Sequence, residues 1–131
     1  MVATASFAGI INTIAGNSVT WTFAGPTATV TVASGQRLTA VASALLRKFT
    51  AGSQFFDYGI CYSSGGTLTN FAGLSNYLTA EVDNGPRHSY AASATVAPPA
   101  GTYSVGFCVR NGGTNPIDDN DYVNGWVQVT N

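Results

Sequence analysis

Charged side chains are scarce in this chain of 131 residues, which has five lysines and arginines, six aspartates and glutamates and a net charge of −1. The basic residues form no stripe that could neutralise a phosphate backbone, so we expect no nucleic-acid partner. Long apolar runs are also missing, because glycine, serine and threonine interrupt each run well before the roughly 18 residues that a membrane-spanning helix needs. We therefore expect no insertion into a membrane.

Groups typical of catalytic sites are equally few. The chain has one histidine, His88, and no serine elbow flanked by glycines of the kind that hydrolases use. Three of the six carboxylates crowd one loop, whereas the pair of a glycosidase comes from separate elements that flank a cleft. The sequence therefore predicts a protein that is not an enzyme.

Helical periodicity is nearly absent too, and segments that alternate apolar with polar residues take its place. Only residues 38–46 are compatible with a short helix, and the hairpin pattern around them favours a strand. Residues 1–14 are either an opening strand or an arm on a neighbouring chain. Strands are expected at residues 19–23, 28–32, 38–46, 55–62, 77–82, 89–96, 102–110 and 122–129.

Glycine, proline and asparagine turns separate these strands, and no repeat, linker or charge block divides the chain. We expect residues 89–96 and 102–110 to pair with each other across the Ala97–Gly101 connection. The pattern predicts a single all-β domain over residues 1–131, folded as a two-sheet sandwich or jelly roll. The composition, rich in serine and threonine, favours a secreted or cell-surface protein, although residues 1–15 lack the basic start of a secretory signal.

The last expected strand has two buriable faces. Val123, Val127 and Val129 line one side, and Tyr122 and Trp126 stand on the other. Such a strand suits a sheet that packs on its own core and also on a neighbouring subunit. The alternative is an immunoglobulin-like structural or adhesive module, which would leave the aromatic side exposed.

Two features could carry a cross-link or a metal. Cys61 and Cys108 either form a disulfide or remain buried thiols, and the sequence leaves both open. Asp118, Asp119 and Asp121 offer hard oxygen ligands that suit Ca²⁺, but their loop lacks the glycine and distal glutamate of an EF-hand. A solvated polar turn is the alternative, and we expect no cofactor.

Aromatic residues interleaved with arginines suggest a sugar site. A sugar presents apolar C–H faces and close-set hydroxyls, so its site needs a ring and charged groups that donate or accept in pairs. Tyr58, Tyr77, Arg87, Arg110 and Asp118 are such groups. The alternative is that these tyrosines belong to the core and the arginines to the surface.

Several short motifs carry a resemblance to a known family. They are Asp57–Ile60, Tyr77 ten residues before Arg87, Ala94–Val96, Gly101–Arg110, Ile117–Asp118 and Asp121–Val129. In this order and spacing, residues 50–131 resemble the tumour-necrosis-factor (TNF) and C1q jelly-roll superfamily. They are most similar to the bacterial TNF-like fucose-binding lectin domain found at the N-terminus of a Burkholderia superlectin.

The resemblance implies a homotrimeric lectin for fucosylated glycans, with sites between neighbouring protomers. Tyr58, Tyr77 and Arg87 would come from one chain, and Arg110 with Asp118 from the next. We expect Asp118 to hold the guanidinium of Arg110. The chain departs from the family at two further candidate positions: Asn84 begins the segment where the family has Ser-Thr-Gly, and Asp119 replaces a serine.

Overall fold

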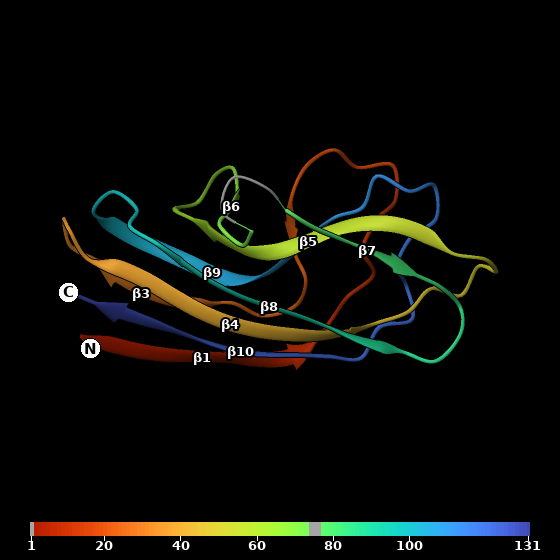
Figure 1. Cartoon of the computed structure of the whole chain (residues 1–131), viewed down its shortest axis with the longest axis horizontal. Coiled ribbons are helices and arrows are strands. Elements are labelled where there is room, and N and C mark those ends of the chain that lie inside the picture. The colour runs from red at the N-terminus through yellow and green to blue at the C-terminus, as the bar shows by residue number, and fades with distance from the viewer. Residues whose placement is uncertain (1, 74–76) are drawn as a thin grey trace.

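The computed structural model of the protein describes residues 2–73 and 77–131, and every regular element in this part of the chain is a β-strand (Figure 1). Within it there is accordingly no helix that is long and apolar enough to cross a membrane. The strands are β1 (Ala3–Ile10), β2 (Thr22–Phe23), β3 (Ala28–Val32), β4 (Arg37–Leu46), β5 (Gln54–Ser63), β6 (Thr69–Asn70), β7 (Leu78–Val82), β8 (His88–Val96), β9 (Gly101–Arg110) and β10 (Tyr122–Thr130).

The strands form two antiparallel sheets. The first sheet has the order β1-β10-β4-β8, which sets the first strand beside the last. In the second sheet β9 and β5 pair at the centre, β2 and β3 flank β9, and β6 and β7 flank β5. Counting β2 with β3 and β6 with β7 gives eight strand positions in two sheets, which is a jelly roll. The predicted all-β, two-sheet jelly-roll sandwich is confirmed, and this strand order excludes the fold of the immunoglobulin-like alternative.

The expected pairing of residues 89–96 with 102–110 is also wrong. Strand β8 pairs with β4 in the first sheet, whereas β9 pairs with β5, β2 and β3 in the second. The connection between them carries Pro98 and Pro99, which have no backbone N–H to donate to a hairpin ladder. The chain therefore crosses from one sheet to the other at this point.

The expected strand at residues 19–23 is shorter than predicted. Only Thr22 and Phe23 pair, opposite Val109 and Cys108 of β9. Val19 is 86% exposed, and a neighbouring backbone hydrogen bond joins Ser18 N to Asn111 O at 2.9 Å. The alternation of residues 19–23 therefore belongs to a loop that is held at the end of the second sheet.

Strand β10 has the two faces that its sequence predicts. Val123, Val127 and Val129 are fully buried in the core, whereas Tyr122 is 49% and Trp126 37% exposed on the outer face. Strand β1 pairs with β10 along its whole length, so residues 3–10 are an opening strand and not a detached arm. In residues 2–73 and 77–131, no strand packs on this outer face of the first sheet.

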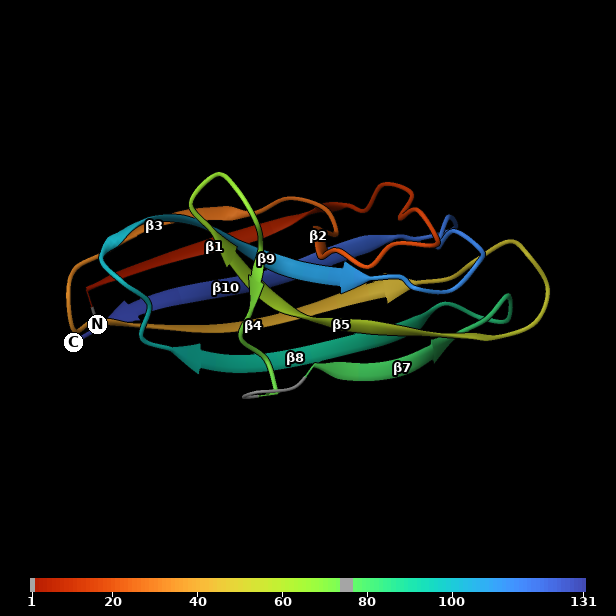
Figure 2. The same ribbon diagram turned by 90° about the horizontal axis from the view of Figure 1, so that it is seen from above.

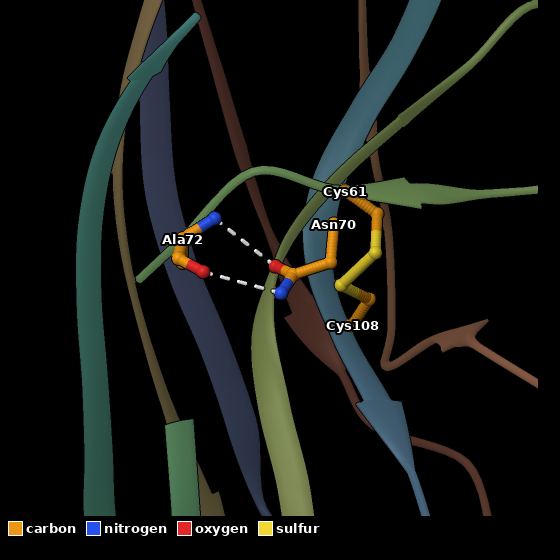
Figure 3. Close-up of a disulfide and its surroundings, with 4 residues drawn as sticks. All are labelled: Cys61, Asn70, Ala72 and Cys108. Atoms are coloured by element: carbon orange, nitrogen blue, oxygen red, sulfur yellow. Dashed lines mark hydrogen bonds between the residues drawn. A yellow bond between two sulfur atoms is a disulfide. The ribbon is translucent and has the colours of Figure 1, made fainter. Parts of the chain in front are cut away.

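A disulfide joins the two central strands of the second sheet (Figure 3). Cys61 is opposite Gly106 and Cys108 is opposite Gly59, so both sulfur atoms lie on the outer side of the β5–β9 pair. The side chain of Asn70 lies over the bridge region and bonds the backbone N–H and C=O of Ala72. A Cβ at Gly59 would stand 2.1 Å from Asn70 Oδ1, so this close cover requires glycine.

Nearly all charged residues gather at one end of the sandwich. Of the eleven charged residues in the sequence, only Arg37 lies at the end where the two termini stand side by side (Figures 1 and 2). The others lie where β4, β7 and β9 end and β5, β8 and β10 begin, and in the loops between them. We call this the charged end; basic residues that are scattered in the sequence meet there.

Candidate functional site

Arg110, the last residue of β9, is the centre of the candidate site. Its Nε and Nη2 donate hydrogen bonds of 3.0 and 2.8 Å to Oδ2 of Asp57, the residue opposite it on β5. The expectation that Asp118 holds this guanidinium is wrong. Asp118 Oδ1 instead accepts a hydrogen bond of 3.0 Å from the backbone N–H of Phe49.

Two aromatic rings flank the same guanidinium. Its Cζ lies 4.8 Å from the ring centroid of Trp21 and 4.4 Å from that of Tyr77, and the two centroids are 6.5 Å apart. These three distances make nearly a right angle at Cζ, so the rings stand on adjacent sides and do not sandwich the cation. Cation–π attraction thus adds to the Asp57 pair in fixing the arginine, and Tyr77 keeps 47% of its surface exposed.

An open depression of about 360 Å³ lies beside Arg110. Phe55, Asp57 and Arg110 line it together with the backbone of Gly112 and Gly113. The Phe55 ring is 66% exposed on the same face of β5 as Asp57, whose other oxygen, Oδ1, accepts a hydrogen bond of 2.9 Å from Thr79 Oγ1. The depression therefore offers an apolar ring beside a carboxylate and a guanidinium.

The arginine has donors left for a ligand. A guanidinium carries five N–H groups, and two of them are engaged by Asp57. Nη1 donates to no group in the described chain, so its N–H groups remain available to a ligand. Hydroxyl groups of a ligand can accept from these N–H groups and donate to the Asp57 carboxylate.

A second cluster at the charged end contains the candidate residues Asn84, Arg87 and Asp119. Arg87 Nε and Nη2 donate to the backbone oxygen and to Oδ1 of Asp119 at 2.9 and 2.8 Å. Arg47 donates from Nη1 to Asp119 Oδ2, and its Nη2 bonds the Asn84 carbonyl at 2.7 Å. The hydrogen bond from Arg47, with help from Arg87, holds the pKa of the Asp119 carboxyl below its usual value.

This cluster fastens three segments together: the end of β4, the turn before β8 and the loop before β10. Both carboxylate oxygens of Asp119 accept hydrogen bonds from arginines, so Asp119 positions Arg87. In residues 2–73 and 77–131, no three histidine, cysteine, aspartate or glutamate side chains gather in a way that could hold a metal ion. The calcium alternative for Asp118, Asp119 and Asp121 therefore finds no support.

Tyr58 lies on the inner face of β5, away from Arg110. Its ring stacks on Phe107 at 5.6 Å and meets Tyr90 edge-on at 5.7 Å. Its hydroxyl donates to the Ala91 carbonyl at 3.4 Å, and burial raises the pKa of that hydroxyl. Within one chain, Tyr58 therefore packs against the core, as the alternative to a sugar-binding role predicts.

Sequence reasoning missed Trp21, Phe55 and Asp57 as members of the site. The alternation of β5 sets Phe55 and Asp57 on one face, opposite Phe56 and Tyr58. The sequence was therefore enough to predict that Phe55 and Asp57 lie on the same side of the strand. What the sequence did not carry is the register that brings Asp57 opposite Arg110, 53 residues away. No local signal marked Trp21, which reaches Arg110 from a loop.

No family model and no curated protein matches the sequence. A search of solved structures finds matches of low similarity. One is the structure of the CBM22-1–GH10 modules of Clostridium thermocellum xylanase 10B complexed with xylohexaose. It matches at 12% identity and a TM-score of 0.37, over 95% of this chain and 29% of that one. A Podospora anserina GH26–CBM35 mannanase matches at 13% identity and a TM-score of 0.35 over 100% of this chain and 28% of that one. A carbohydrate-binding module of Cellvibrio mixtus lichenase 5A, in complex with cellotriose, matches at 14% identity and a TM-score of 0.27 over 94% and 98%.

The chain thus spans less than a third of the first two of these structures. All three TM-scores are below 0.5, so these likenesses assign neither a family nor a ligand to this chain.

Proposed function

We propose that the protein is a lectin that binds carbohydrate, without catalysis or metal, in the depression beside Arg110. The observation that carries this proposal is the fixed pair of Arg110 and Asp57 next to the exposed ring of Phe55. The ring offers a surface for the C–H face of a sugar, and the charged pair offers donors and an acceptor for adjacent hydroxyls.

The finer part of the proposal is that the glycans are fucosylated. Fucose presents a methyl group together with vicinal hydroxyls, so one ligand would use both Phe55 and the Arg110–Asp57 pair. The order and spacing of the motifs shared with TNF-like fucose-binding lectins support this choice. The loss of the family's hydroxyl-bearing segment at Asn84 removes one contact, which the Arg110 depression would have to replace.

We also propose that the protein is a homotrimer with its sites between protomers. The outer face of the β1-β10-β4-β8 sheet supports assembly, because Ile10, Val41, Tyr122 and Trp126 are exposed on it. Arg37 is the one charged residue among the described outward-facing positions of these four strands. A broad face with so little charge is typical of a protein–protein interface.

In this arrangement the second cluster would complete the site of a neighbouring chain. The Arg87 side chain remains 41% exposed after pairing with Asp119, so it has donors available across an interface. Tyr77 has an exposed ring at the same end of the fold. The proposed site then takes Arg110 and its depression from one protomer and Arg87 from the next, with Tyr58 supporting the wall from within.

A secreted or cell-surface location is part of the same proposal. The Cys61–Cys108 disulfide supports it, because such bridges persist in oxidising compartments. Glycans presented on cells or in secretions are found in the same surroundings.

Replacing Arg110 tests the proposed site. Charge-assisted hydrogen bonds to a partly desolvated guanidinium are worth about 1.5–3 kcal/mol each, so we expect Arg110→Ala to weaken glycan binding by a factor on the order of ten to a hundred. Arg110→Lys should not rescue binding, because a lysine cannot pair with Asp57 through a planar fork. Calorimetric titration of the glycan that binds best measures both effects.

Arg37→Ala is the matched control. Arg37 begins β4 at the end near the termini, whereas Arg110 ends β9 at the charged end, so the control removes one arginine far from the depression. We expect unchanged affinity in this variant. Equal affinities of the wild type and of folded Arg110→Ala would remove Arg110 from the site.

A further inference from the structure

We propose that Asp57 makes this site selective for uncharged glycans and excludes glycans that carry a carboxylate. The inference rests on the proposed function and names the ligand class of the same depression. It concerns a residue that determines specificity through its charge as well as by positioning Arg110.

The register of the second sheet sets three polar side chains side by side. Arg110 of β9, Asp57 of β5 and Thr79 of β7 are opposite one another and form a single row across three strands. In the next row Phe55 is opposite Glu81, which is exposed and lies on the same outer face. Arg110 and Asp57 therefore line the depression, and the Glu81 carboxylate stands next to it, beside Phe55.

Asp57 occupies one edge of the Arg110 guanidinium. Asp57 Oδ2 accepts from both Nε and Nη2, which form one of the two edges through which a guanidinium can bind a carboxylate in bidentate fashion. The edge formed by Nη1 and the second N–H of Nη2 remains, and an anion bound there would lie within a few ångströms of Asp57. Repulsion from Asp57 and Glu81 would offset its attraction to Arg110.

A neutral hydroxyl meets no such opposition. It can accept a hydrogen bond from Nη1 and donate one to the Asp57 carboxylate, which has unused acceptor capacity. A site lined in this way favours neutral sugars with adjacent hydroxyls over uronic acids and sialic acids. An arginine without an acidic neighbour would attract the acidic groups of a sugar. Here Asp57 offsets that attraction.

Asp57→Asn tests this assignment because the amide keeps the shape of the carboxyl and removes its charge. Trp21 and Tyr77 still flank the guanidinium, so Arg110 stays near the depression with an unbalanced positive charge. We expect this variant to bind acetate, as the simplest carboxylate, at least tenfold more tightly than the wild type. Its affinity for methyl α-L-fucoside, a neutral probe, should fall about tenfold, since the ligand loses a charged acceptor.

The measurement is a titration followed by ¹H–¹⁵N NMR of the Arg110 Nε–H, with the backbone amide spectrum reporting that the fold is intact. Glu81→Gln is a second variant, with an expected smaller gain for acetate. Asp121→Asn is the control for net charge. Asp121 is exposed immediately before β10 and is not among the residues that line the depression. Acetate should bind this control as weakly as it binds the wild type.

The outcomes separate this inference from the proposed function. No gain for acetate in folded Asp57→Asn, or an equal gain in Asp121→Asn, overturns the role of Asp57 whatever sugars the protein binds. A wild type that binds sialylated and neutral glycans equally well overturns it too. A gain for acetate in Asp57→Asn, with no glycan bound by the wild type, supports the charge assignment and overturns the lectin proposal.

Discussion

Asp119 illustrates how single residues set the geometry of the charged end. It holds Arg47 and Arg87 with its two carboxylate oxygens, and these contacts lower the pKa of its carboxyl. A group with a lowered pKa in the folded protein contributes stability that is complete above its ordinary pKa. That contribution is lost as the pH falls below 3.8, the usual value, toward the folded pKa.

We therefore expect the melting temperature of the wild type to fall between pH 5 and pH 2.5 more steeply than that of Asp119→Asn. The variant should be the less stable protein at pH 7, and the difference should narrow on acidification because the wild-type carboxyl becomes protonated. Thermal unfolding followed by circular dichroism across this pH range measures both curves. Parallel curves would mean that the arginines do not stabilise the charged form of Asp119.

At the scale of residues, the sequence could indicate on which face of a strand a charged side chain lies, but not with which residue it forms an ion pair. Alternation along β5 and β9 correctly sets Asp57 and Arg110 on exposed faces of their strands. Asp118 seemed the nearer partner because only eight positions separate it from Arg110 in the chain. The true partner depends on the β5–β9 register, which is fixed by the burial of both strands and not by any local motif.

The pair of strands β5 and β9 is the element that supports the site, and the disulfide locks it. Cys108 lies on the same side of β9 as Arg110, so its side chain points away from the main core. The sequence left the bridge open because it did not show that Cys61 points to the same side of the neighbouring strand. Strand β6 and the Asn70 turn then bury the sulfur atoms on that side.

Removing the bridge should destabilise the protein without unfolding it. The cysteines are 47 residues apart. In the loop-entropy model, closing a loop of that length lowers the entropy of the unfolded chain and so raises its free energy by about 4 kcal/mol. We expect Cys61→Ala/Cys108→Ala to lose about 2–4 kcal/mol of unfolding free energy in guanidinium titrations. Reducing the wild type should produce a comparable loss, and a loss below about 1 kcal/mol in both would show that the bridge contributes little.

Most strands could be predicted at this scale because each has one face in the core. Strands β3, β4 and β10 follow their alternation of apolar and polar residues closely. The pairing of β8 and β9 failed because neighbours in sequence usually form hairpins, whereas a jelly roll sends consecutive strands to different sheets. Topology of this kind depends on contacts between distant segments, which local patterns do not encode.

At the scale of the whole molecule, the outer face of the first sheet carries Arg37 as its one charged residue among the described positions, and we propose that a partner covers this face. We expect light scattering at micromolar concentration to give a mass about three times the 13.5 kDa of one chain. A mass near that of one chain would contradict the trimer. It would leave Ile10, Tyr122 and Trp126 exposed to solvent in the working protein.

Trp126→Ala tests whether this face is the interface. Removing a large aromatic side chain costs about 3–5 kcal/mol where it is buried, and much of this cost should appear in assembly because Trp126 is 37% exposed in one chain. We expect a melting temperature that depends strongly on protein concentration in the variant. An unchanged melt would put Trp126 on the free surface of the assembly.

The central claim is that this jelly roll binds glycans through Arg110 and without a metal. A glycan array probed with the wild type, with and without chelator, and with Arg110→Ala in parallel tests it most directly. We expect the wild type to bind a set of neutral, fucosylated glycans equally well with and without chelator, and Arg110→Ala to lose most of that signal. No binding to any glycan by the folded wild type would contradict the account and favour a structural or adhesive role for the domain.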